Sequence, residues 1–431
     1  MPNIRSNKGT ILLSRLQAAI PPTAALLACL AASTFSAPAA AQWLQRGYDA
    51  AATYANTAET TLTPANVSQL SRLWRTHAPS QMGLIHGEAT ESGGLIFDCN
   101  LPSVAHARSS TTGSLAWQTA LDAESCTTPA LGGGRVYMAL GKVAQGNTNG
   151  LVALDQATGA VLWQSTWPAD AEGVNAPALV GDTLYVADRT GNLRAVDANT
   201  GAVKWQSQTA PDSLNNATVV AGGRVFVTTL LPWGGVTAPG TYAFDAATGR
   251  RLWSRLQNGC SYIFDPAMVL GDRVIIGPCG AGPLTARRAS DGKLLWKKDD
   301  LPDHPVRPLT GHGNTIFSAH SSYLIAMDAD TGLEHWRLEE QTAYDHFLTN
   351  LVWANGMLFM LIDKALDDAL ELRVLDATTG KSLARRPHKI PDYAEPFGNS
   401  LTVADGQVQI GYYLSVPGGV STVHWVAYGL K

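Results

Sequence analysis

A short pattern that recurs along almost the whole chain constrains its fold more than any other feature of the sequence. The clearest copy is LVALDQATGAVLW, from Leu151 to Trp163. Four further copies end at Trp205, Trp253, Trp296 and Trp336, and weaker copies end at Trp117 and at Ala384, where alanine replaces tryptophan. A chain that repeats one local unit in this way builds an array of similar units.

Each copy has the local chemistry of a β-hairpin. Alternating residues indicate a strand, the aspartate can accept hydrogen bonds from the amides that follow it, and Thr-Gly closes a tight turn because glycine adopts positive φ freely. The second strand carries the tryptophan. Another strand pair with its own turn precedes the hairpin, as in PALVGDTLYVAD from Pro177 to Asp188. Four short strands per unit predict a propeller blade, because such a unit buries both faces only by stacking against neighbours.

The two ends of the chain carry two halves of one further unit. LSRLWRTH places Trp74 on a tryptophan strand without a preceding turn, and VSTVHWVAYGLK at the C-terminus matches a first hairpin strand that stops before any turn. We therefore expect residues 73–76 to pair with residues 423–428. This pairing closes an all-β, eight-bladed propeller of four-stranded antiparallel blades and removes both open sheet edges. The tryptophan-strand positions are Trp74, Trp117, Trp163, Trp205, Trp253, Trp296, Trp336 and Ala384.

A small residue stands two places before the repeat aspartate, or its equivalent, in every unit. Small side chains there let neighbouring sheets approach, while each tryptophan fills the adjacent gap. Both positions are expected to be structural, since large aromatic residues at a fixed repeat position usually belong to the core. The small residues are Ala107, Ala153, Ala195, Ala243, Ala286, Ala326, Val374 and Ala427.

Residues 1–41 differ in composition from the rest. Basic residues precede an apolar run over residues 23–35, and small residues follow it up to Ala41. This order is typical of a cleaved signal peptide, so we expect a periplasmic or secreted mature chain of residues 42–431. The apolar run is shorter than a membrane-spanning helix requires. A lipoprotein anchor at Cys29 is the alternative, because the residues before it approximate a lipobox.

The composition is that of a globular chain, with 45% hydrophobic residues, 15% charged residues and a net charge of −4. A nucleic-acid-binding domain would be basic, so no nucleic-acid partner is expected. No transmembrane segment is expected in the mature chain, which we expect to be a monomer.

Four cysteines remain after export, an even number in an oxidising compartment. Proximity along the chain predicts two disulfides, Cys99 with Cys126 and Cys260 with Cys279. Free buried thiols are the alternative. A zinc site is disfavoured because the sequence has no C-x-x-C pair, and no metal site is predicted.

Candidate binding residues occupy the position just before the innermost strand of each blade. The chain enters that strand at one mouth of the central channel, so these side chains should surround the mouth. The longest insertions, residues 230–240 with Trp233 and residues 364–370, join second and third strands and would emerge on the same face. The alternative is that polar residues at the mouth simply contact water. The eight positions, all polar, are His86, Thr127, Asn175, Asn216, Asp265, Arg307, Thr349 and Asn399.

Three of these residues are the strongest candidates. His86, Asp265 and Arg307 would place an imidazole, a carboxylate and a guanidinium around one concave site, which could orient a polar ligand. The Asp-x-x-Thr-Gly turns on the opposite face are near-identical copies, so they are expected to be structural. An acidic insertion at Asp363, Asp367, Asp368 and Glu371 is expected to be a solvated loop, since a calcium site would need further oxygen ligands.

The repeated hairpin, close to A-x-D-x-x-T-G-x-x-x-W, resembles the signature of the PQQ-like (pyrroloquinoline-quinone-like, or quinoprotein dehydrogenase-like) β-propeller family. The resemblance covers nearly all of residues 43–431. The stretch from Gln42 to Arg75 is also similar to the N-terminal lead-in of quinoprotein dehydrogenases. WD40 propellers are the nearest alternative. Their repeats place tryptophan directly before aspartate and carry a Gly-His pair per blade, whereas this chain has one such pair, Gly311-His312.

The resemblance implies two different functions. Quinone-dependent alcohol or sugar dehydrogenases of this kind hold PQQ against a vicinal cysteine disulfide, with Glu, Asn and Asp on a calcium ion. This sequence has no adjacent cysteines, no G-D-N or G-x-G-N-P segment and no C-x-x-C-H haem attachment. Other relatives, such as the outer-membrane-assembly propeller lipoproteins, are non-enzymatic scaffolds. The missing motifs favour a ligand- or protein-binding scaffold, with a PQQ- and Ca²⁺-dependent oxidoreductase acting at the channel mouth as the alternative.

Overall fold

The fold is known from a computed structural model of the chain, in which most of the residues after Ala40 are described. No helix in the described residues is long and apolar enough to cross a membrane. The described ranges are 41–79, 87–100, 103–143, 148–168, 174–209, 214–230, 239–256, 267–277, 283–299, 301, 309–320, 323–339, 345–391, 395–415 and 420–431.

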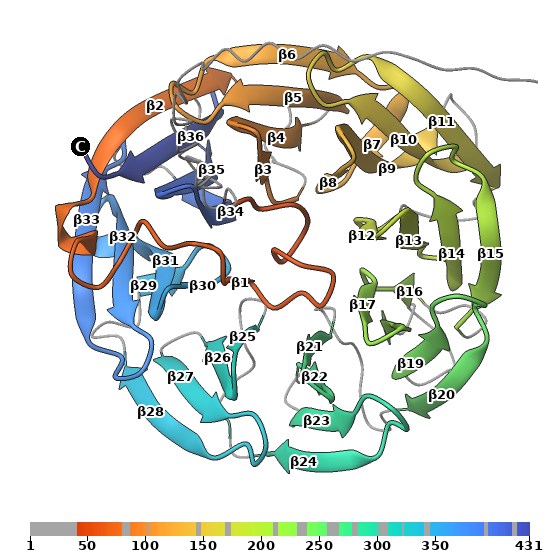
Figure 1. Ribbon diagram of the computed structural model, residues 1–431. Coiled ribbons are helices and arrows are strands. Elements are labelled where there is room, and N and C mark those ends of the chain that lie inside the picture. Colours follow the sequence, from red (N-terminus) through yellow and green to blue (C-terminus); the bar gives the residue numbers. More distant parts are fainter. Residues whose placement is uncertain are drawn as a thin grey trace, which may run out of the picture. The chain divides into compact units, whose positions relative to one another are not determined.

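Eight antiparallel sheets form the blades of a closed ring (Figure 1). From the ring axis outward, blade one contains β3 (Thr90–Ser92), β4 (Leu95–Asn100), β5 (Val104–Ser109) and β6 (Leu115–Ala120). In blade two, β7 (Ala123–Cys126) and β8 (Ala130–Gly132) both pair with β9 (Arg135–Val143), followed by β10 (Thr148–Asp155) and β11 (Val161–Pro168). Blade three contains β12 (Ala178–Val180), β13 (Thr183–Ala187), β14 (Asn192–Asp197) and β15 (Val203–Gln208).

Blades four to six repeat this order. In blade four, β16 (Leu214–Asn215) and β17 (Val219–Ala221) pair with β18 (Arg224–Leu230), followed by β19 (Gly240–Asp245) and β20 (Arg251–Leu256). Blade five contains β21 (Met268–Leu270), β22 (Arg273–Ile276), β23 (Leu284–Arg288) and β24 (Leu294–Lys298). Blade six contains β25 (Thr310–His312), β26 (Thr315–Ala319), β27 (Tyr323–Asp328) and β28 (Glu334–Glu339).

The last two blades include strands from the start of the chain. In blade seven, β29 (Asp345–Phe347) and β30 (Val352–Ala354) pair with β31 (Met357–Lys364). The 3₁₀ turn η2 (Ala365–Asp367), β32 (Ala369–Asp376) and β33 (Ser382–Lys389) follow. The short β1 (Ala55–Asn56) runs parallel to β30. Blade eight contains β34 (Glu395–Ala404), β35 (Gln407–Ser415), β36 (Thr422–Gly429) and β2 (Ser71–Pro79), which follows the 3₁₀ turn η1 (Val67–Gln69). The eight-bladed all-β propeller is therefore confirmed.

The pairing of β2 with β36 closes the ring as predicted. Trp74 lies opposite Ala427 and Thr76 lies opposite Trp425, with a bulge at Leu73. The N-terminal strand thus supplies the fourth strand of a sheet whose other three strands come from the C-terminus. Every blade then has a neighbour on both sides.

Each repeat tryptophan joins its own blade to the next one. The Trp117 indole nitrogen donates a hydrogen bond to the Gln156 carbonyl oxygen at 3.0 Å. Its ring packs on Gly159, where a Cβ would come within 2.5 Å of a ring carbon. This glycine has a φ of +73°, so the turn needs glycine both for its backbone and for the ring that covers it. The same packing occurs for Trp74 on Gly113, Trp163 on Gly201, Trp205 on Gly249, Trp253 on Gly292, Trp296 on Gly332 and Trp336 on Gly380.

The small residue of the repeat lies directly across from the tryptophan of its own blade. Ala153, for example, faces Trp163 in the β10–β11 pair and is fully buried. The small side chain leaves room for the indole inside the blade. Blade seven is the exception, because there Val374 faces Ala384. The junction between blades seven and eight is therefore built without the repeat indole.

Candidate binding face

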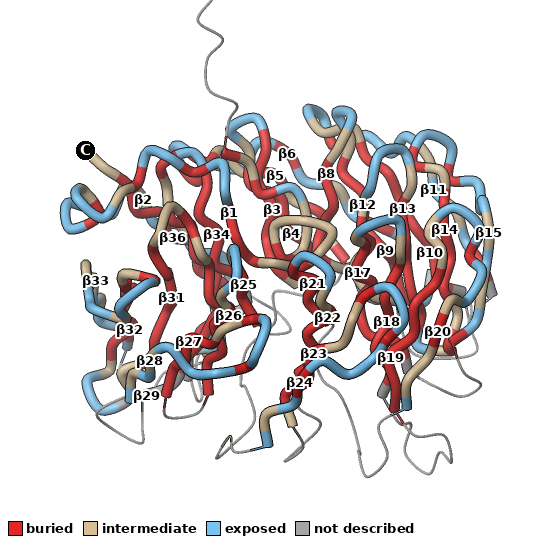
Figure 2. The backbone as a smooth tube through the Cα atoms, turned by 60° about the horizontal axis from the view of Figure 1, so that its bottom comes forward, coloured by how far each residue is buried: buried red, intermediate tan, exposed pale blue. Residues whose placement is uncertain are grey.

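The two faces of the ring are built differently. The turn face carries the turns between first and second strands and the Asp-x-x-Thr-Gly turns, and the opposite face is the mouth, where the chain enters the innermost strands. Figure 2 shows exposed turns following buried strands along the upper side of the ring. Asp155 accepts hydrogen bonds from the Ala157 and Thr158 amides and from the Thr158 hydroxyl. The bonds from Thr158 lower the pKa of Asp155, which identifies this carboxylate as part of the turn.

An N-terminal segment, residues 41–56, crosses the ring axis (Figure 1). It forms hydrogen bonds with the innermost strand of every blade, in chain order around the ring. The bonds are Trp43 N to Glu91 O at 2.9 Å, Leu131 N to Leu44 O at 2.7 Å, Leu179 N to Gln45 Oε1 at 2.8 Å, Val220 N to Ala50 O at 2.6 Å, Val269 N to Ala51 O at 2.9 Å, Gly311 N to Thr53 O at 2.9 Å, Trp353 N to Tyr54 O at 2.9 Å and Asn56 Nδ2 to Val403 O at 2.7 Å.

These contacts satisfy the free inner edges of the blades. In blades one to seven the bonded residue is the middle one of a three-residue strand, directly before the first turn of the blade. Unpaired amides at such an edge would otherwise need water or another chain. The N-terminal segment therefore occupies the turn-face end of the channel and leaves the mouth as the other end.

The backbone of the segment is held in unusual conformations. Tyr48, Ala52 and Tyr54 have φ values of 76°, 54° and 53°, which non-glycine residues rarely adopt. Such strain persists only where the surroundings fix the conformation. One such anchor is Glu88, whose carboxylate accepts a hydrogen bond from the Tyr54 hydroxyl at 2.5 Å and another from the Gly47 amide at 3.1 Å.

A second buried acid lies where the segment meets blades one and eight. Glu91 is 1% exposed, and Gln409 donates a hydrogen bond to its Oε2 at 2.7 Å. Burial, with the negative charges of Asp405 and Glu59 nearby, raises the pKa of Glu91 to about 8. This carboxyl group therefore holds its proton in the range where an exposed glutamate is ionised.

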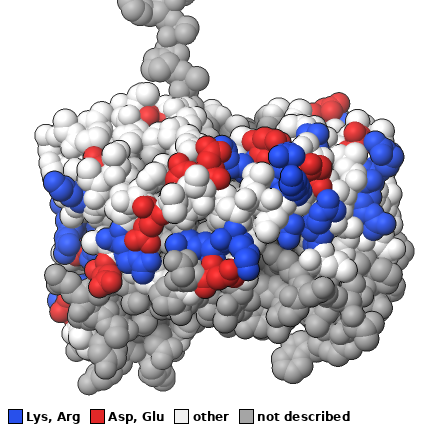
Figure 3. Space-filling view, turned by 90° about the horizontal axis from the view of Figure 1, so that it is seen from below, with Lys and Arg blue, Asp and Glu red and all other residues white. Residues whose placement is uncertain are grey.

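Figure 3 shows basic and acidic side chains intermixed on the side of the ring that it displays. Ion pairs on blades five and six join Arg288 to Asp291 at 3.2 Å and Arg337 to Glu334 at 2.8 Å. Opposite charges this close give no extended field of one sign, so this surface has no electrostatic preference for a charged ligand.

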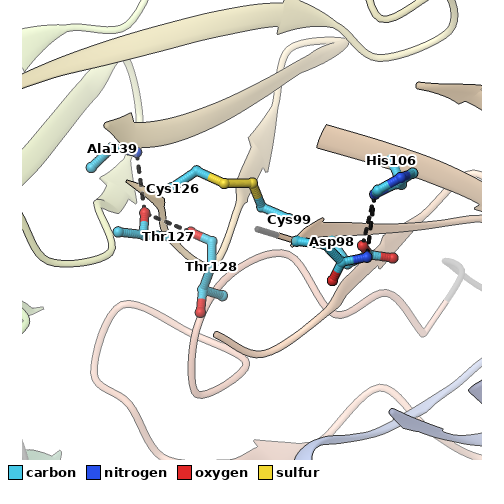
Figure 4. Close-up of a disulfide and its surroundings, with 8 residues drawn as sticks. Asp98, Cys99, His106, Cys126, Thr127, Thr128 and Ala139 are labelled. Atoms are coloured by element: carbon cyan, nitrogen blue, oxygen red, sulfur yellow. Dashed lines mark hydrogen bonds and ion pairs between the residues drawn. A yellow bond between two sulfur atoms is a disulfide. The ribbon is translucent and has the colours of Figure 1, made fainter. Parts of the chain in front are cut away.

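Four of the predicted mouth residues are described with their side chains, and each bonds the second strand of its own blade. Ala139 N donates to Thr127 Oγ1 at 3.1 Å (Figure 4), and Leu361 N donates to Thr349 Oγ1 at 3.2 Å. Asn175 Nδ2 donates to the Ala187 carbonyl at 3.2 Å. In the same way, Asn216 Nδ2 donates to Thr228 Oγ1 at 2.9 Å.

The shared bonding gives these positions a structural role in addition to any contact with a ligand. Asn175 also donates to the Asn215 carbonyl of the next blade at 2.7 Å, so it joins two blades. Asn399 lies on β34. The remaining predicted positions, His86, Asp265 and Arg307, lie outside the described residues, as does Trp233 of the long insertion.

The described mouth residues do not fit a calcium ion with a bound quinone. They offer hydroxyl and amide groups that already bond their own blades, whereas calcium sites are rich in carboxylates. Within the described ranges, no group of three or more His, Cys, Asp or Glu side chains is placed to hold a metal ion.

One predicted disulfide is present beside these residues. Cys99, on β4, bonds Cys126, at the end of β7, with their Cα atoms 6.1 Å apart (Figure 4). The bond ties blade one to blade two next to Thr127. The second predicted pair, Cys260 and Cys279, lies outside the described residues.

Sequence reasoning missed a buried carboxylate near this disulfide. Asp98 is 0% exposed and lies 3.2 Å from His106 Nδ1 and 3.8 Å from Arg108 Nε. Asp98 and His106 are cross-strand neighbours on β4 and β5. The signal was available, because a charged residue in the alternating pattern of an inner strand indicates a buried ion pair.

Comparisons with known proteins agree with this architecture. A family model described as outer membrane protein assembly factor BamB matches residues 63–208 and 147–383. Quinohemoprotein alcohol dehydrogenase ADH-IIG of Pseudomonas putida is 34% identical over 114 residues, which cover 24% of this chain and 15% of that protein. Quinoprotein ethanol dehydrogenase of Pseudomonas aeruginosa is 31% identical over 120 residues, 22% of this chain and 19% of that protein. The match thus spans less than a fifth of either relative's length.

Solved structures show the same fold. The quinohemoprotein alcohol dehydrogenase of Comamonas testosteroni superimposes with a TM-score of 0.67 and 16% identity, over 90% of this chain and 80% of that one. BamB of Moraxella catarrhalis superimposes with a TM-score of 0.55 and 18% identity, over 83% of this chain and 97% of that one. Because the family model extends from residue 63 to residue 383 over the repeats that build the ring, the chain belongs to the PQQ-like β-propeller family.

Proposed function

We propose that the protein is an exported binding scaffold that takes a polar ligand or a protein segment at the mouth of its channel. The observation that carries this proposal is the N-terminal segment, which bonds the innermost strands of all eight blades at the turn-face end. A binder that approaches the ring axis then has the mouth as its entrance. The leader that we expect to be cleaved near Ala41 would direct the export of the chain.

Specificity would come from the side chains that differ between blades. The Asp-x-x-Thr-Gly turns are near-identical copies whose carboxylates are used within the turn, as at Asp155, so they offer the same surface on blade after blade. The mouth positions include neutral, acidic and basic residues. His86, Asp265 and Arg307 are the residues we propose to orient the ligand.

Single alanine substitutions test this assignment of faces. The immobilised full-length mature protein would be challenged with extract of the producing cells, and the retained components quantified for His86→Ala, Asp265→Ala and Arg307→Ala. Asp197→Ala, in a turn, is the matched control. We expect at least one mouth variant to lose the component that the wild type and the turn variant retain. Loss in a folded turn variant, with retention in all three mouth variants, would place binding on the other face.

A quinone-dependent oxidoreductase is the second candidate, because the two Pseudomonas relatives reported above are named quinohemoprotein alcohol dehydrogenase and quinoprotein ethanol dehydrogenase. The test is a titration of the protein with PQQ and CaCl₂, followed by absorption, and then by alcohol-dependent reduction of an artificial electron acceptor. Saturation at one quinone per chain together with acceptor reduction would establish this second function. A spectrum equal to the sum of protein and free quinone supports the scaffold.

A further inference from the structure

The junction between blades seven and eight departs from the repeat. Ala384 replaces the tryptophan there, and Arg386 reaches across instead, donating from Nε to the Leu70 carbonyl at 2.5 Å and from Nη2 to the Ser68 carbonyl. The outer strands β33 and β2 flank this junction in Figure 1. The Arg386 side chain therefore bridges the two blades at this junction, where the repeat has alanine in place of tryptophan.

A set of aromatic and basic residues, called here the basic cluster, lies at this junction. Its exposed members lie on β2, its half-buried members on β33, and its buried members on β35 and β36. Tyr412, Tyr428 and His424 are 0%, 4% and 6% exposed, respectively. The members are Arg72, Arg75, His77, Arg386, His388, Tyr412, His424 and Tyr428.

The geometry fixes the protonation of His424. Arg75 Nη2 lies 3.1 Å from His424 Nδ1, and a guanidinium can only donate, so Nδ1 is the acceptor. The proton is then on Nε2, which donates to Thr422 Oγ1 at 2.7 Å. The ring stacks between Tyr412, at a centroid distance of 5.0 Å, and the exposed His77, at 5.6 Å. His424 thus holds Arg75 in place as a neutral imidazole.

His388 is held between two phenols. Its Nε2 lies 3.3 Å from the Tyr412 hydroxyl and its Nδ1 lies 3.2 Å from the Tyr428 hydroxyl. A neutral imidazole donates through one nitrogen and accepts through the other, so one of the two phenols accepts from His388 and keeps its own proton for another acceptor. The basic cluster therefore contains a hydroxyl donor.

The positive charge of the basic cluster is not balanced within the described part of the chain. Burial, with Arg75 nearby, lowers the pKa of both His388 and His424 to about 4. The described groups that lower these two pKa values besides burial are Arg75 and Arg72 for His388, and Arg75, His77 and His388 for His424, and none is an acid. The described residues provide no carboxylate in ion-pair contact with Arg72 or Arg75, in contrast to the paired charges on blades five and six.

We propose that the basic cluster is a binding site for an oxyanion, namely a phosphate group held by the guanidinium groups of Arg72 and Arg75. Guanidinium groups match the geometry of phosphate oxygens, and a neighbouring phenol can add a hydrogen bond. The site is separate from the mouth and does not depend on the function proposed there. A free phosphate and an anionic lipid headgroup share this chemistry.

Calorimetric titration with inorganic phosphate, at constant ionic strength, tests the site on the mature protein. We expect saturable binding that weakens at least tenfold in the double variant R72Q/R75Q. Arg385→Gln is the matched control, because Arg385 is an exposed arginine on β33, the strand of Arg386, and its side chain bonds the Ser382 hydroxyl. Arg72→Gln alone covers the case in which the double variant fails to fold, since the Arg72 side chain forms no hydrogen bond or ion pair with the described residues.

Co-sedimentation with vesicles distinguishes the source of the phosphate group. Vesicles containing phosphatidylglycerol should sediment the wild type and Arg385→Gln, but not R72Q/R75Q, if the ligand is a lipid headgroup. Vesicles of phosphatidylcholine are the neutral control. The proposal would be overturned if R72Q/R75Q and Arg72→Gln bound each probe as well as the wild type does. It would also be overturned if the wild type bound neither inorganic phosphate nor the anionic vesicles.

Discussion

Tyr54 donates a hydrogen bond from its hydroxyl to the carboxylate of Glu88 at 2.5 Å, which anchors the N-terminal segment to blade one. Both residues are buried, and the same carboxylate also accepts a hydrogen bond from the Gly47 amide, earlier in the segment. One glutamate thus fixes a stretch whose backbone is strained at several positions. The path of the N-terminal segment between these two contacts is therefore fixed by Glu88.

Removing the Tyr54 hydroxyl should loosen the segment. Tyr54→Phe leaves a buried carboxylate without one of its donors, so we expect the free energy of unfolding to fall by about 1–3 kcal/mol. Chemical denaturation measures the change. Tyr48→Phe is the matched control, because Tyr48 lies in the same segment and its hydroxyl has no hydrogen bond with the described residues. An equal effect of the two substitutions would contradict the anchoring role of Glu88.

The stability of the protein should depend on pH through Glu91. Its pKa is raised from 4.5 to about 8 in the folded state, so the stability it contributes is fully present below pH 4.5 and is lost as the pH rises to about 8. Glu91→Gln should match the wild type near pH 4.5 and exceed it at pH 8.5 by ~2–4 kcal/mol. Denaturation at the two pH values measures this, with the exposed Glu339→Gln as control. If the difference in unfolding free energy between Glu91→Gln and the wild type were the same at both pH values, the raised pKa of Glu91 would be contradicted.

The packing of tryptophan on glycine can be separated from backbone strain. Gly159 and Gly133 both have positive φ, but a Cβ would meet the Trp117 ring only at Gly159, while nothing lies within 4 Å at Gly133. Gly133→Ala should cost about 1 kcal/mol for the left-handed backbone. Gly159→Ala should cost a further ~1–3 kcal/mol for the displaced indole. Equal losses in thermal or chemical unfolding would show that the ring does not need the glycine.

The disulfide between Cys99 and Cys126 closes a loop with a sequence separation of 27 residues. In the chain-entropy estimate such a crosslink is worth about 3 kcal/mol, so Cys99→Ala/Cys126→Ala should lower the unfolding free energy by roughly that amount. Thiol counting on the denatured, unreduced mature protein checks the bond itself. At most two free thiols are expected, and none if Cys260 pairs with Cys279. Four free thiols would rule out the disulfide.

Much of the fold could be predicted from the sequence because the repeat is local. The turn at Asp155 is formed by residues two or three positions away, and the pairing of Trp74 with Ala427 follows from two half-units at the chain ends. The N-terminal segment could not be predicted in this way. Its contacts with the blades are mostly backbone hydrogen bonds, which leave little trace in residue type.

The mouth positions illustrate a second limit. Their polarity was correctly read from the sequence, but polarity alone does not say which atoms a side chain bonds. Thr127 and Thr349 accept hydrogen bonds from backbone amides of their own blades. A strand end needs such an acceptor whether or not a ligand is present. The basic cluster could not be predicted, because β2 and β33 lie far apart in the sequence and only the closed ring brings them together.

The most direct test of the mouth as the binding face is a photo-crosslinking scan of the mature protein in the cell envelope of the producing organism. A photoreactive amino acid would replace His86, Asp265 or Arg307 at the mouth, and Ala157, Asn199 or Ala247 in the turns. We predict a discrete adduct, with one partner or ligand mass, from mouth positions and none from turn positions. The same adduct from the turns, with no product from the mouth, would contradict the account.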